Sequence, residues 1–318
     1  MFALLLAGCN DTQSTLAPAG TGAQEIARLS WVMFAGAAVV WLAVMALALH
    51  ATRRRAAPHP PRSARRLVLV GGVLVPTVVL GTLLYHGLLM MPGLREPPQQ
   101  RRVVVEVSGE QWWWRVRYLR EGRPPVTAAN EVRLPRGERT ELRLSSPDVI
   151  HSFWVPALAG KLDMTPGRTS TLVLEPTREG VFEGICAEYC GTAHALMRFK
   201  AVVMEPDAFD GWLDRQAAPA RPPDGALARH GQAAFRDHGC GACHAVRGTG
   251  AAGGVGPDLT HIGSRLSLGA GILPNDREAL RGWIADAHAS KPGVLMPAFH
   301  MLAADEVEAI AAYLEGLE

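Results

Sequence analysis

The chain has 318 residues, of which 48% are hydrophobic, and a formal net charge of +2 at neutral pH. This length exceeds that of one ordinary domain, so we expect several structural parts. The nearly balanced charge excludes the strongly basic surface that is typical of nucleic-acid-binding proteins, and we expect no nucleic-acid partner.

The first residues combine a short apolar stretch with a cysteine. The run Leu6-Ala7-Gly8-Cys9 resembles a bacterial lipobox, in which a signal peptide is cut before a cysteine that becomes lipidated. The resemblance implies a signal peptide over residues 1–8 and a mature chain that begins at Cys9. The alternative is an apolar N-terminus with a free thiol.

Two apolar stretches follow, at Leu29 to His50 and Leu67 to Met91, within an N-terminal region of residues 9–95. Each is long enough to cross a membrane as a helix. The connecting loop, residues 51–66, contains six arginines, so the positive-inside rule predicts that it is cytoplasmic and that both chain ends face outward. No Asp or Glu occurs from Ile26 to Arg95, so we interpret this hairpin as an anchor rather than a proton relay.

After a Pro-rich connector, residues 96–210 contain short stretches of alternating polarity that predict strands. These are Arg102 to Val107, Trp112 to Tyr118, Glu131 to Leu134, Thr140 to Leu144, Thr169 to Leu174 and Arg198 to Met204. Their spacing favours an all-β Greek-key sandwich. The strand period of two predicts that Trp112 and Trp114 share one face and that Trp113 lies on the other.

A short segment of this region concentrates soft metal ligands. Cys186, Cys190, His194 and Met197 lie within twelve residues, and His151 is a suitable upstream imidazole. Thiolate, imidazole and thioether together favour copper, and two cysteines at this spacing favour a dinuclear centre in which both thiolates bridge both ions. Zinc is less favoured because the cysteines are not in a Cys-x-x-Cys pair and the segment ends in Met. A disulfide between Cys186 and Cys190 is the other alternative.

The C-terminal part, residues 226–318, follows a linker at 211–225 that contains Pro219, Pro222 and Pro223. Cys240-Gly241-Ala242-Cys243-His244 has the form that attaches haem c through two thioethers, with His244 as an iron ligand. We predict Met296, which lies between two prolines, as the second iron ligand; Met301 and His300 are weaker candidates.

Helical periodicity predicts flanking helices over Leu227 to His238 and Ala304 to Leu314. This combination of motif and flanking helices resembles an all-α class I cytochrome c. The alternative is an accidental motif that binds nothing.

With these motifs, residues 20 to 207 resemble subunit II of a haem-copper oxidase, whose dinuclear copper centre is called CuA. The resemblance implies that Cys186 and Cys190 bridge the copper ions and that His151 and His194 are terminal ligands. It also implies that Met197 and the backbone carbonyl of Glu188 are weak axial ligands and that the Glu188 side chain reaches a magnesium ion. Trp112 would be the residue through which electrons arrive; packing is the alternative for it.

The resemblance, with the fused haem motif, identifies the chain as subunit II of a caa-type cytochrome c oxidase. Electrons would pass from haem c through CuA to subunit I, where dioxygen is reduced to water with proton pumping. The implied partners are subunits I and III, membrane lipid, and an upstream cytochrome c or cytochrome bc complex as electron donor. The implied location is the bacterial cytoplasmic membrane, with the copper and haem domains outside.

Other protein classes remain as alternatives. A CuA-bearing subunit of a nitric oxide reductase is the closest one, and the two-helix hairpin with a fused haem domain favours the oxidase over it. A copper-delivery lipoprotein would not need the haem motif. Nitrous oxide reductase would carry a large propeller, and a quinol oxidase subunit would lack the copper ligands.

Overall fold

The structure is a computed structural model that describes residues 12–53, 61–95 and 103–318. Cys9, the proposed signal peptide and the connector at 96–102 therefore lie outside the described residues. The described part of residues 24–96 forms one compact unit, and the remainder forms a second one.

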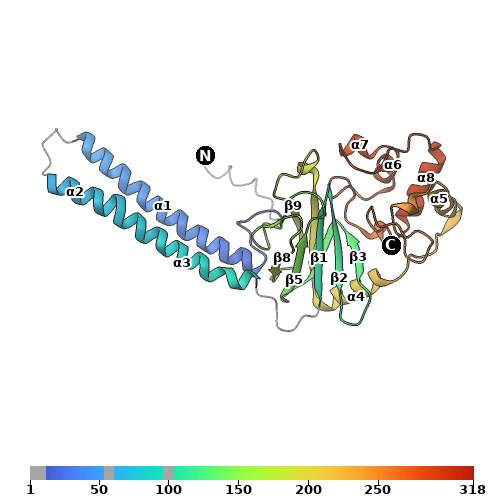
Figure 1. The fold of residues 1–318 in the computed structure, drawn as a ribbon, viewed down its shortest axis with the longest axis horizontal. Helices are drawn as coiled ribbons and strands as arrows, with labels where there is room; N and C mark the ends of the chain where they lie inside the picture. Colours follow the sequence, from blue (N-terminus) through green and yellow to red (C-terminus); the bar gives the residue numbers. More distant parts are fainter. Residues whose placement is uncertain (1–11, 54–60, 96–102) are drawn as a thin grey trace, which may run out of the picture. The chain divides into compact units, whose positions relative to one another are not determined.

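The first unit is a pair of long apolar helices. The chain runs along α1 (Thr21–Arg53) and returns through α2 (Pro61–Leu69), a π-helical turn at Val70–Leu74, and α3 (Val75–Arg95) (Figure 1). Both helical segments are long and apolar enough to cross a membrane, and their windows have mean hydropathies of 2.5 and 2.4 with no buried residues. Large apolar side chains exposed along their whole length need an apolar surrounding such as lipid. The prediction of two membrane-spanning helices agrees with this finding.

The predicted hairpin loop is shorter in the structure. Helix α2 begins at Pro61, so Arg62, Arg65 and Arg66 lie on a helix rather than in a loop. The π-helical turn contains Gly71 and Gly72, which weaken regular α-helical bonding at that point.

The second unit contains a sandwich of two five-stranded sheets, which we call the β-sandwich domain (residues 103–217). One sheet has the order β3 (Val126–Ala129), β2 (Trp113–Leu119), β1 (Val104–Glu110), β5 (Thr140–Ser145) and β8 (Ser170–Leu174). The other has the order β4 (Glu131–Pro135), β10 (Arg198–Met204), β9 (Gly180–Cys186), β6 (His151–Trp154) and β7 (Leu162–Met164). β1 and β5 pair in parallel, as do β4 and β10; the other pairs are antiparallel.

All six predicted strands are present, with boundaries shifted by at most a few residues. The sequence analysis missed β3, β6, β7 and β9. β6 and β7 have only four and three residues, too few to show alternation, and β9 contains two glycines that interrupt its pattern.

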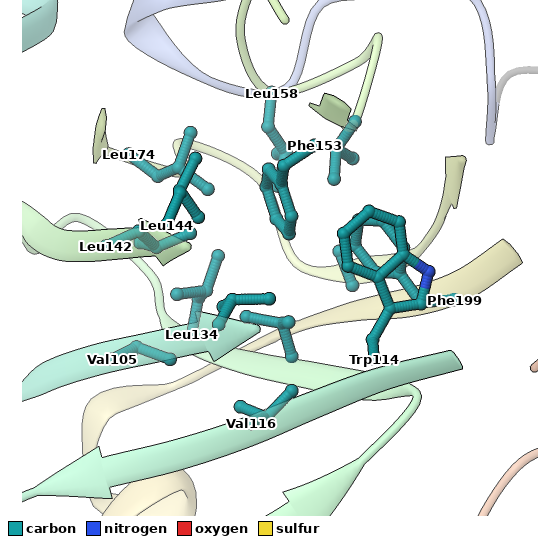
Figure 2. Packing of buried hydrophobic residues seen from close by; sticks show 14 of the residues in the cluster. Val105, Trp114, Val116, Leu134, Leu142, Leu144, Phe153, Leu158, Leu174 and Phe199 are labelled. Atoms are coloured by element: carbon teal, nitrogen blue, oxygen red, sulfur yellow. The ribbon is translucent and has the colours of Figure 1, made fainter. Parts of the chain in front are cut away.

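Aliphatic side chains, mostly Val and Leu, fill the core of the sandwich together with three aromatic rings, those of Trp114, Phe153 and Phe199, as Figure 2 shows. The Trp114 ring is 5.0 Å from that of Phe199 and 5.9 Å from that of Phe153, and both pairs are edge-to-face. Trp112 and Trp114 are buried, whereas Trp113 is half-buried beneath the Arg115 guanidinium, 4.6 Å from its ring. Trp113 and Trp114 alternate within β2 as predicted, whereas Trp112 lies in the turn before the strand, so a face shared by Trp112 and Trp114 stays a prediction.

A helix occupies the first half of the predicted linker. α4 (Pro206–Ala217) starts with a proline at its first position and buries Phe209, Trp212 and Leu213. The Trp212 and Phe209 rings pack on Tyr118 of β2, at 5.1 and 6.1 Å. Residues 211–217 of the predicted linker thus belong to α4, whose apolar face is buried against the sandwich. Only residues 218–224 form an extended connection.

The remaining residues form the C-terminal helical domain (residues 225–318). It contains α5 (Gly225–Asp237), α6 (Arg277–Ala285), α7 (Ala287–Ser290) and α8 (Ala304–Glu315), with 3-10 turns at Cys240–Ala242 and Ile262–Ser264. α5 and α8 are the two predicted helices, and they cross in close contact at Gly231. A Cβ there would lie 1.8 Å from the carbonyl oxygen of Ala309. The expected all-α fold is confirmed, while α6 and α7 were not predicted.

Candidate copper and haem sites

The cysteine-rich loop connects two paired strands. β9 ends at Cys186 and β10 begins at Arg198, and these strands are antiparallel neighbours. A backbone hydrogen bond from the Cys186 N–H to the Met197 carbonyl, at 3.0 Å, closes the loop at its base. The chain turns at Gly191, whose φ of 114° favours glycine. The strands thus bring both ends of the predicted ligand run together.

The sulfur and imidazole atoms of this loop lie close to one another. The two Sγ atoms of Cys186 and Cys190 are 3.7 Å apart, and both cysteines are buried, free thiols. The Cys190 Sγ is 3.5 Å from Nδ1 of His194 and 3.8 Å from Sδ of Met197. The predicted disulfide alternative is wrong for this structure, since the sulfurs are not bonded.

His151 comes from the neighbouring strand. β6 pairs with β9, with Phe153 opposite Cys186, and this register directs His151 toward the loop. Its Nδ1 is 3.8 Å from the Cys186 Sγ, and the same sulfur lies 3.2 Å from the carbonyl oxygen of Glu188. His151, Cys186 and Cys190 form a buried cluster with ligand atoms within 4.8 Å of one another. The structure therefore brings all six predicted copper ligands together.

These spacings can be compared with what a metal requires. A first-row metal bound to sulfur at about 2.3 Å and to nitrogen at about 2.0 Å, with tetrahedral angles, separates the two atoms by roughly 3.5 Å. The observed separations of 3.5 and 3.8 Å match this value. Soft sulfur with imidazole also matches the ligand preference of copper. The residues present fit copper, and Cys186, Cys190, His151 and His194 would be the residues that hold it.

Electrostatics prepares the pair for metal binding. The hydrogen bond from Cys190 lowers the pKa of the Cys186 thiol to about 3, with a further contribution from His151. The same hydrogen bond raises the pKa of Cys190 above its ordinary value. A metal bound here would favour the deprotonated form of both thiols, because the thiolate is the form that coordinates a metal.

Asp148 orients the His151 ring from the other side. Its Oδ1 lies 2.9 Å from Nε2 of His151. Burial raises the pKa of Asp148, but hydrogen bonds from His151 and from the Gln111 N–H outweigh burial, so the pKa is lowered overall. Asp148 is thus a carboxylate that leaves Nδ1 of His151 facing the sulfurs, as carboxylates do for metal-bound histidines. The sequence analysis did not identify Asp148, although a carboxylate three residues before a ligand histidine was a usable signal.

The Glu188 side chain has a different partner from the predicted one. Its Oε2 lies 3.3 Å from Nζ of Lys161, which also contacts Asp163 at 3.1 Å. Nothing in the arrangement of the described residues supports a magnesium ion at this position. That role of Glu188 stays a prediction.

The second site is a cavity in the C-terminal helical domain with a volume of about 350 Å3. The four predicted haem residues line it: Cys240, Cys243, His244 and Met296. Most of the remaining lining is apolar, including Phe235, Ile284 and Leu314. Met301 and His300 are 77% and 69% exposed and do not line the cavity, so they are excluded as the second ligand in this structure.

His244 has a fixed orientation in this cavity. Its Nδ1 lies 2.8 Å from the carbonyl oxygen of Pro257, which can only accept a hydrogen bond. Nε2 is then the unprotonated nitrogen and is free to bind iron. Burial lowers the pKa of His244 and keeps the ring neutral. The residues present fit a haem attached at Cys240 and Cys243.

Comparisons with known proteins agree with both sites. Residues 119–205 match the model of the family "Cytochrome C oxidase subunit II, periplasmic domain", and residues 228–318 match that of "Cytochrome c". Two separate stretches of the chain are thus similar to an oxidase subunit II periplasmic domain and to a cytochrome c. The first match contains all the proposed copper ligands and the second all the proposed haem residues.

Individual proteins that the chain resembles are named cytochrome c oxidase subunit 2. The chain is 44% identical to cytochrome c oxidase subunit 2 of Alkalihalophilus pseudofirmus over 192 residues, which cover 60% of this chain and 55% of that protein. It is 32% identical to the same subunit of Bacillus subtilis over 203 residues, covering 61% and 57%. The matched part thus spans little more than half the length of these curated relatives.

A solved structure of a subunit II periplasmic domain, from Bradyrhizobium japonicum, is 27% identical. It covers 37% of this chain and 95% of that chain, with a TM-score of 0.35.

Trp112 lies between the two proposed sites. Its Nε1 donates a hydrogen bond of 2.9 Å to the Cys190 carbonyl, which also accepts one of 2.8 Å from Gln111 Nε2. Trp112 and Gln111 also line the cavity that contains the haem residues. The sequence analysis predicted Trp112 but missed Gln111, because no pattern indicated which loop would cover the cavity.

Proposed function

We propose that this chain is subunit II of a caa-type cytochrome c oxidase. An external donor would deliver electrons to haem c, and the electrons would continue through the dinuclear copper centre to the haem-copper site of subunit I. Dioxygen reduction and proton pumping belong to that partner complex. When bound, haem c and the copper pair would each take up and release one electron at a time.

The observation that carries this proposal is the position of Trp112. One side chain lines the proposed haem cavity and is hydrogen-bonded to the carbonyl of Cys190, a proposed copper ligand. An arrangement in which two redox sites share a residue supports electron relay. A copper-storage protein would have no use for it.

The protein's own residues perform the remaining tasks. The two cysteines, two histidines and Met197 would hold copper with little rearrangement, because the sheets already hold their ligand atoms close together. Asp148 orients His151, and the Pro257 carbonyl orients His244. Preorganised ligands reduce the structural change that accompanies a change of charge, which favours rapid electron transfer.

Low-temperature electron paramagnetic resonance on the oxidised, copper-loaded full chain in detergent tests this proposal. We expect hyperfine structure from one electron shared by two copper nuclei, together with a low-spin haem. Cys186→Ser and Cys190→Ser should each abolish the dinuclear signal and leave the haem absorbance unchanged. Cys9→Ser is the matched control, because Cys9 belongs to neither proposed ligand set, and it should keep both signals.

A mononuclear copper signal in the unaltered chain, or none, would contradict the relay. The oxidase assignment has its own test, which is co-purification with a haem-copper catalytic subunit and dioxygen uptake driven by reduced cytochrome c. Uptake of nitric oxide without dioxygen uptake would favour a nitric oxide reductase instead.

A further inference from the structure

The β-sandwich and C-terminal helical domains contact each other through specific hydrogen bonds. Arg115 donates to the carbonyl of Gly254 at 2.9 Å, and the Arg198 N–H donates to the carbonyl of Ala270 at 3.0 Å. The buried carboxylate of Glu131 accepts a hydrogen bond from the Leu266 N–H. These bonds specify one docking geometry, because each joins a fixed strand or turn to a fixed loop.

Lys291 lies within this interdomain contact and is only 2% exposed. Its Nζ donates to the carbonyl of Trp112 at 2.7 Å and to that of Gly269 at 2.8 Å. Trp112 belongs to the β-sandwich domain, and Gly269 belongs to the C-terminal helical domain. Lys291 therefore joins the two domains at the residue that the two proposed sites share.

Burying a lysine is costly, so its position requires an explanation. Burial lowers the pKa of Lys291 to about 7, against a smaller opposing effect of Cys190. The amine gives one N–H to each of the two carbonyls, so two hydrogen bonds offset part of this cost. An apolar side chain would pack here without that cost but would leave both carbonyls without this donor.

The Trp112 indole is also confined on two sides by glycines. A Cβ on Gly191 would lie 3.0 Å from Cζ2 of Trp112, and one on Gly293 would lie 3.0 Å from Cζ3. Gly191 belongs to the proposed copper loop, and Gly293 lies three residues before Met296. The ring thus touches the backbone of both ligand loops, while Lys291 holds its main chain.

We propose that Lys291 is a positioning residue that holds Trp112 against the haem cavity and the copper loop at the same time. This inference rests on the proposed function. When bound, the haem would give up one electron and the copper pair would take it up, and Lys291 would act only by holding Trp112 between them. No bond forms or breaks, and no proton has to move. Because electron tunnelling weakens steeply with distance, a small displacement of Trp112 slows this step.

The test compares Lys291→Met with the unaltered full chain, both loaded with copper and haem in detergent. A small photoreductant reduces the haem in a flash, and absorbance then follows electron transfer to copper. We expect Lys291→Met to slow this transfer by roughly tenfold to a hundredfold, the scale on which small misplacements act in reactive sites. The static spectra of both centres and the initial reduction of the haem by the photoreductant should stay unchanged, which a general loss of structure would not allow.

Lys200→Met is the matched control. Lys200 is another of the three lysines in the chain, and its ammonium pairs with Glu183 within the β-sandwich domain. This variant should transfer electrons at the rate of the unaltered chain.

Hydrogen exchange gives a readout that does not depend on the cofactors. Lys291→Met should accelerate amide exchange in peptides that contain the Gln111-Trp112 turn and residues 266–271, and leave β10 beyond Lys200 unchanged. Gly293→Ala is a second variant with the same expected effect on transfer, because its Cβ would push the indole away. It covers the case in which Lys291→Met fails to fold.

Transfer at the unaltered rate in both variants, with unchanged exchange, would overturn the role of Lys291. If the unaltered chain binds no copper pair or haem, the proposed function fails separately. The exchange comparison then still decides whether Lys291 holds Trp112.

Discussion

The two proposed cofactor sites of this chain are built in opposite ways. The copper ligands lie on or between hydrogen-bonded strands, and their atoms are 3.5 to 3.8 Å apart. The haem residues line a cavity of about 350 Å3 that part of the β-sandwich domain helps to close. A sheet can hold metal ligands in place by itself, whereas a few short helices around a large apolar cavity need something to fill it. The comparison predicts that the two domains depend on their cofactors to different degrees.

The largest expected effect follows from removing the haem attachment. In a Cys240→Ala/Cys243→Ala chain without haem, the apolar lining of this cavity would be left in contact with water, and a small helical domain would lose much of the apolar burial that stabilises it. We therefore expect hydrogen exchange to show the C-terminal helical domain as unfolded and the β-sandwich domain as protected. The Cys186→Ser/Cys190→Ser chain should keep both domains protected. Equal protection of the helical domain with and without haem would show that the comparison is wrong.

A matched pair of glycines tests how tightly each domain is packed. A Cβ on Gly231 would lie 1.8 Å from the Ala309 carbonyl oxygen, a backbone atom, whereas one on Gly184 would lie 2.1 Å from Cζ at the end of the Phe199 side chain, which can shift without moving the backbone. Overpacking usually costs about 1–3 kcal/mol. We expect Gly231→Ala to cost about 3 kcal/mol or more and Gly184→Ala about 1–2 kcal/mol, measured by thermal unfolding of the two domains.

Gly282 of α6 serves as the control for this pair, because nothing lies within 4 Å of its Cβ position. Gly282→Ala should stabilise the helical domain by about 0.5–1 kcal/mol, through helix propensity alone. If Gly184→Ala destabilises its domain more than Gly231→Ala does, the β-sandwich core is less adaptable than the helix crossing.

The smallest effect concerns a carboxylate beside the copper loop. A hydrogen bond from Ser152 lowers the pKa of Asp163, burial opposes this, and Lys161 lowers the pKa further. Because the pKa is lower in the folded state, the contribution of Asp163 to stability is present above the ordinary aspartate pKa of about 3.9 and is lost as the pH falls through the lowered value. Asp163→Asn should therefore cost a few tenths of a kcal/mol at pH 7, since the group is largely solvated, and nothing in strong acid.

Chemical unfolding of the two chains across this pH range measures the difference. Ser152→Ala provides the control, because it removes the main hydrogen bond and should make the further effect of Asp163→Asn smaller. A difference that persists unchanged in strong acid would mean that Asp163 acts through packing rather than charge.

Much of this molecule could be predicted from residue types and spacings. The two membrane-length segments, six of the ten strands in the described residues, and the first and last helices of the C-terminal domain were predicted, as were the residues that the structure gathers at each proposed site. Copper and haem ligands are recognisable in a sequence because few side chains offer sulfur or imidazole, and their spacing along the chain reflects the geometry of the centre. The length of an apolar segment can likewise be read from the sequence, because it depends on no contact with distant residues.

The sequence by itself determined which residues could bind metal or haem and which segments could cross a membrane. Only the tertiary structure decided that α4 would form where a linker was expected, because that depends on Tyr118 accepting Trp212 and Phe209. It also decided the roles of Asp148, Gln111 and Lys291, whose partners lie on loops distant in sequence. No local pattern indicates that a lysine will be buried against the carbonyl of a tryptophan 179 residues away, because that contact exists only once the two domains meet.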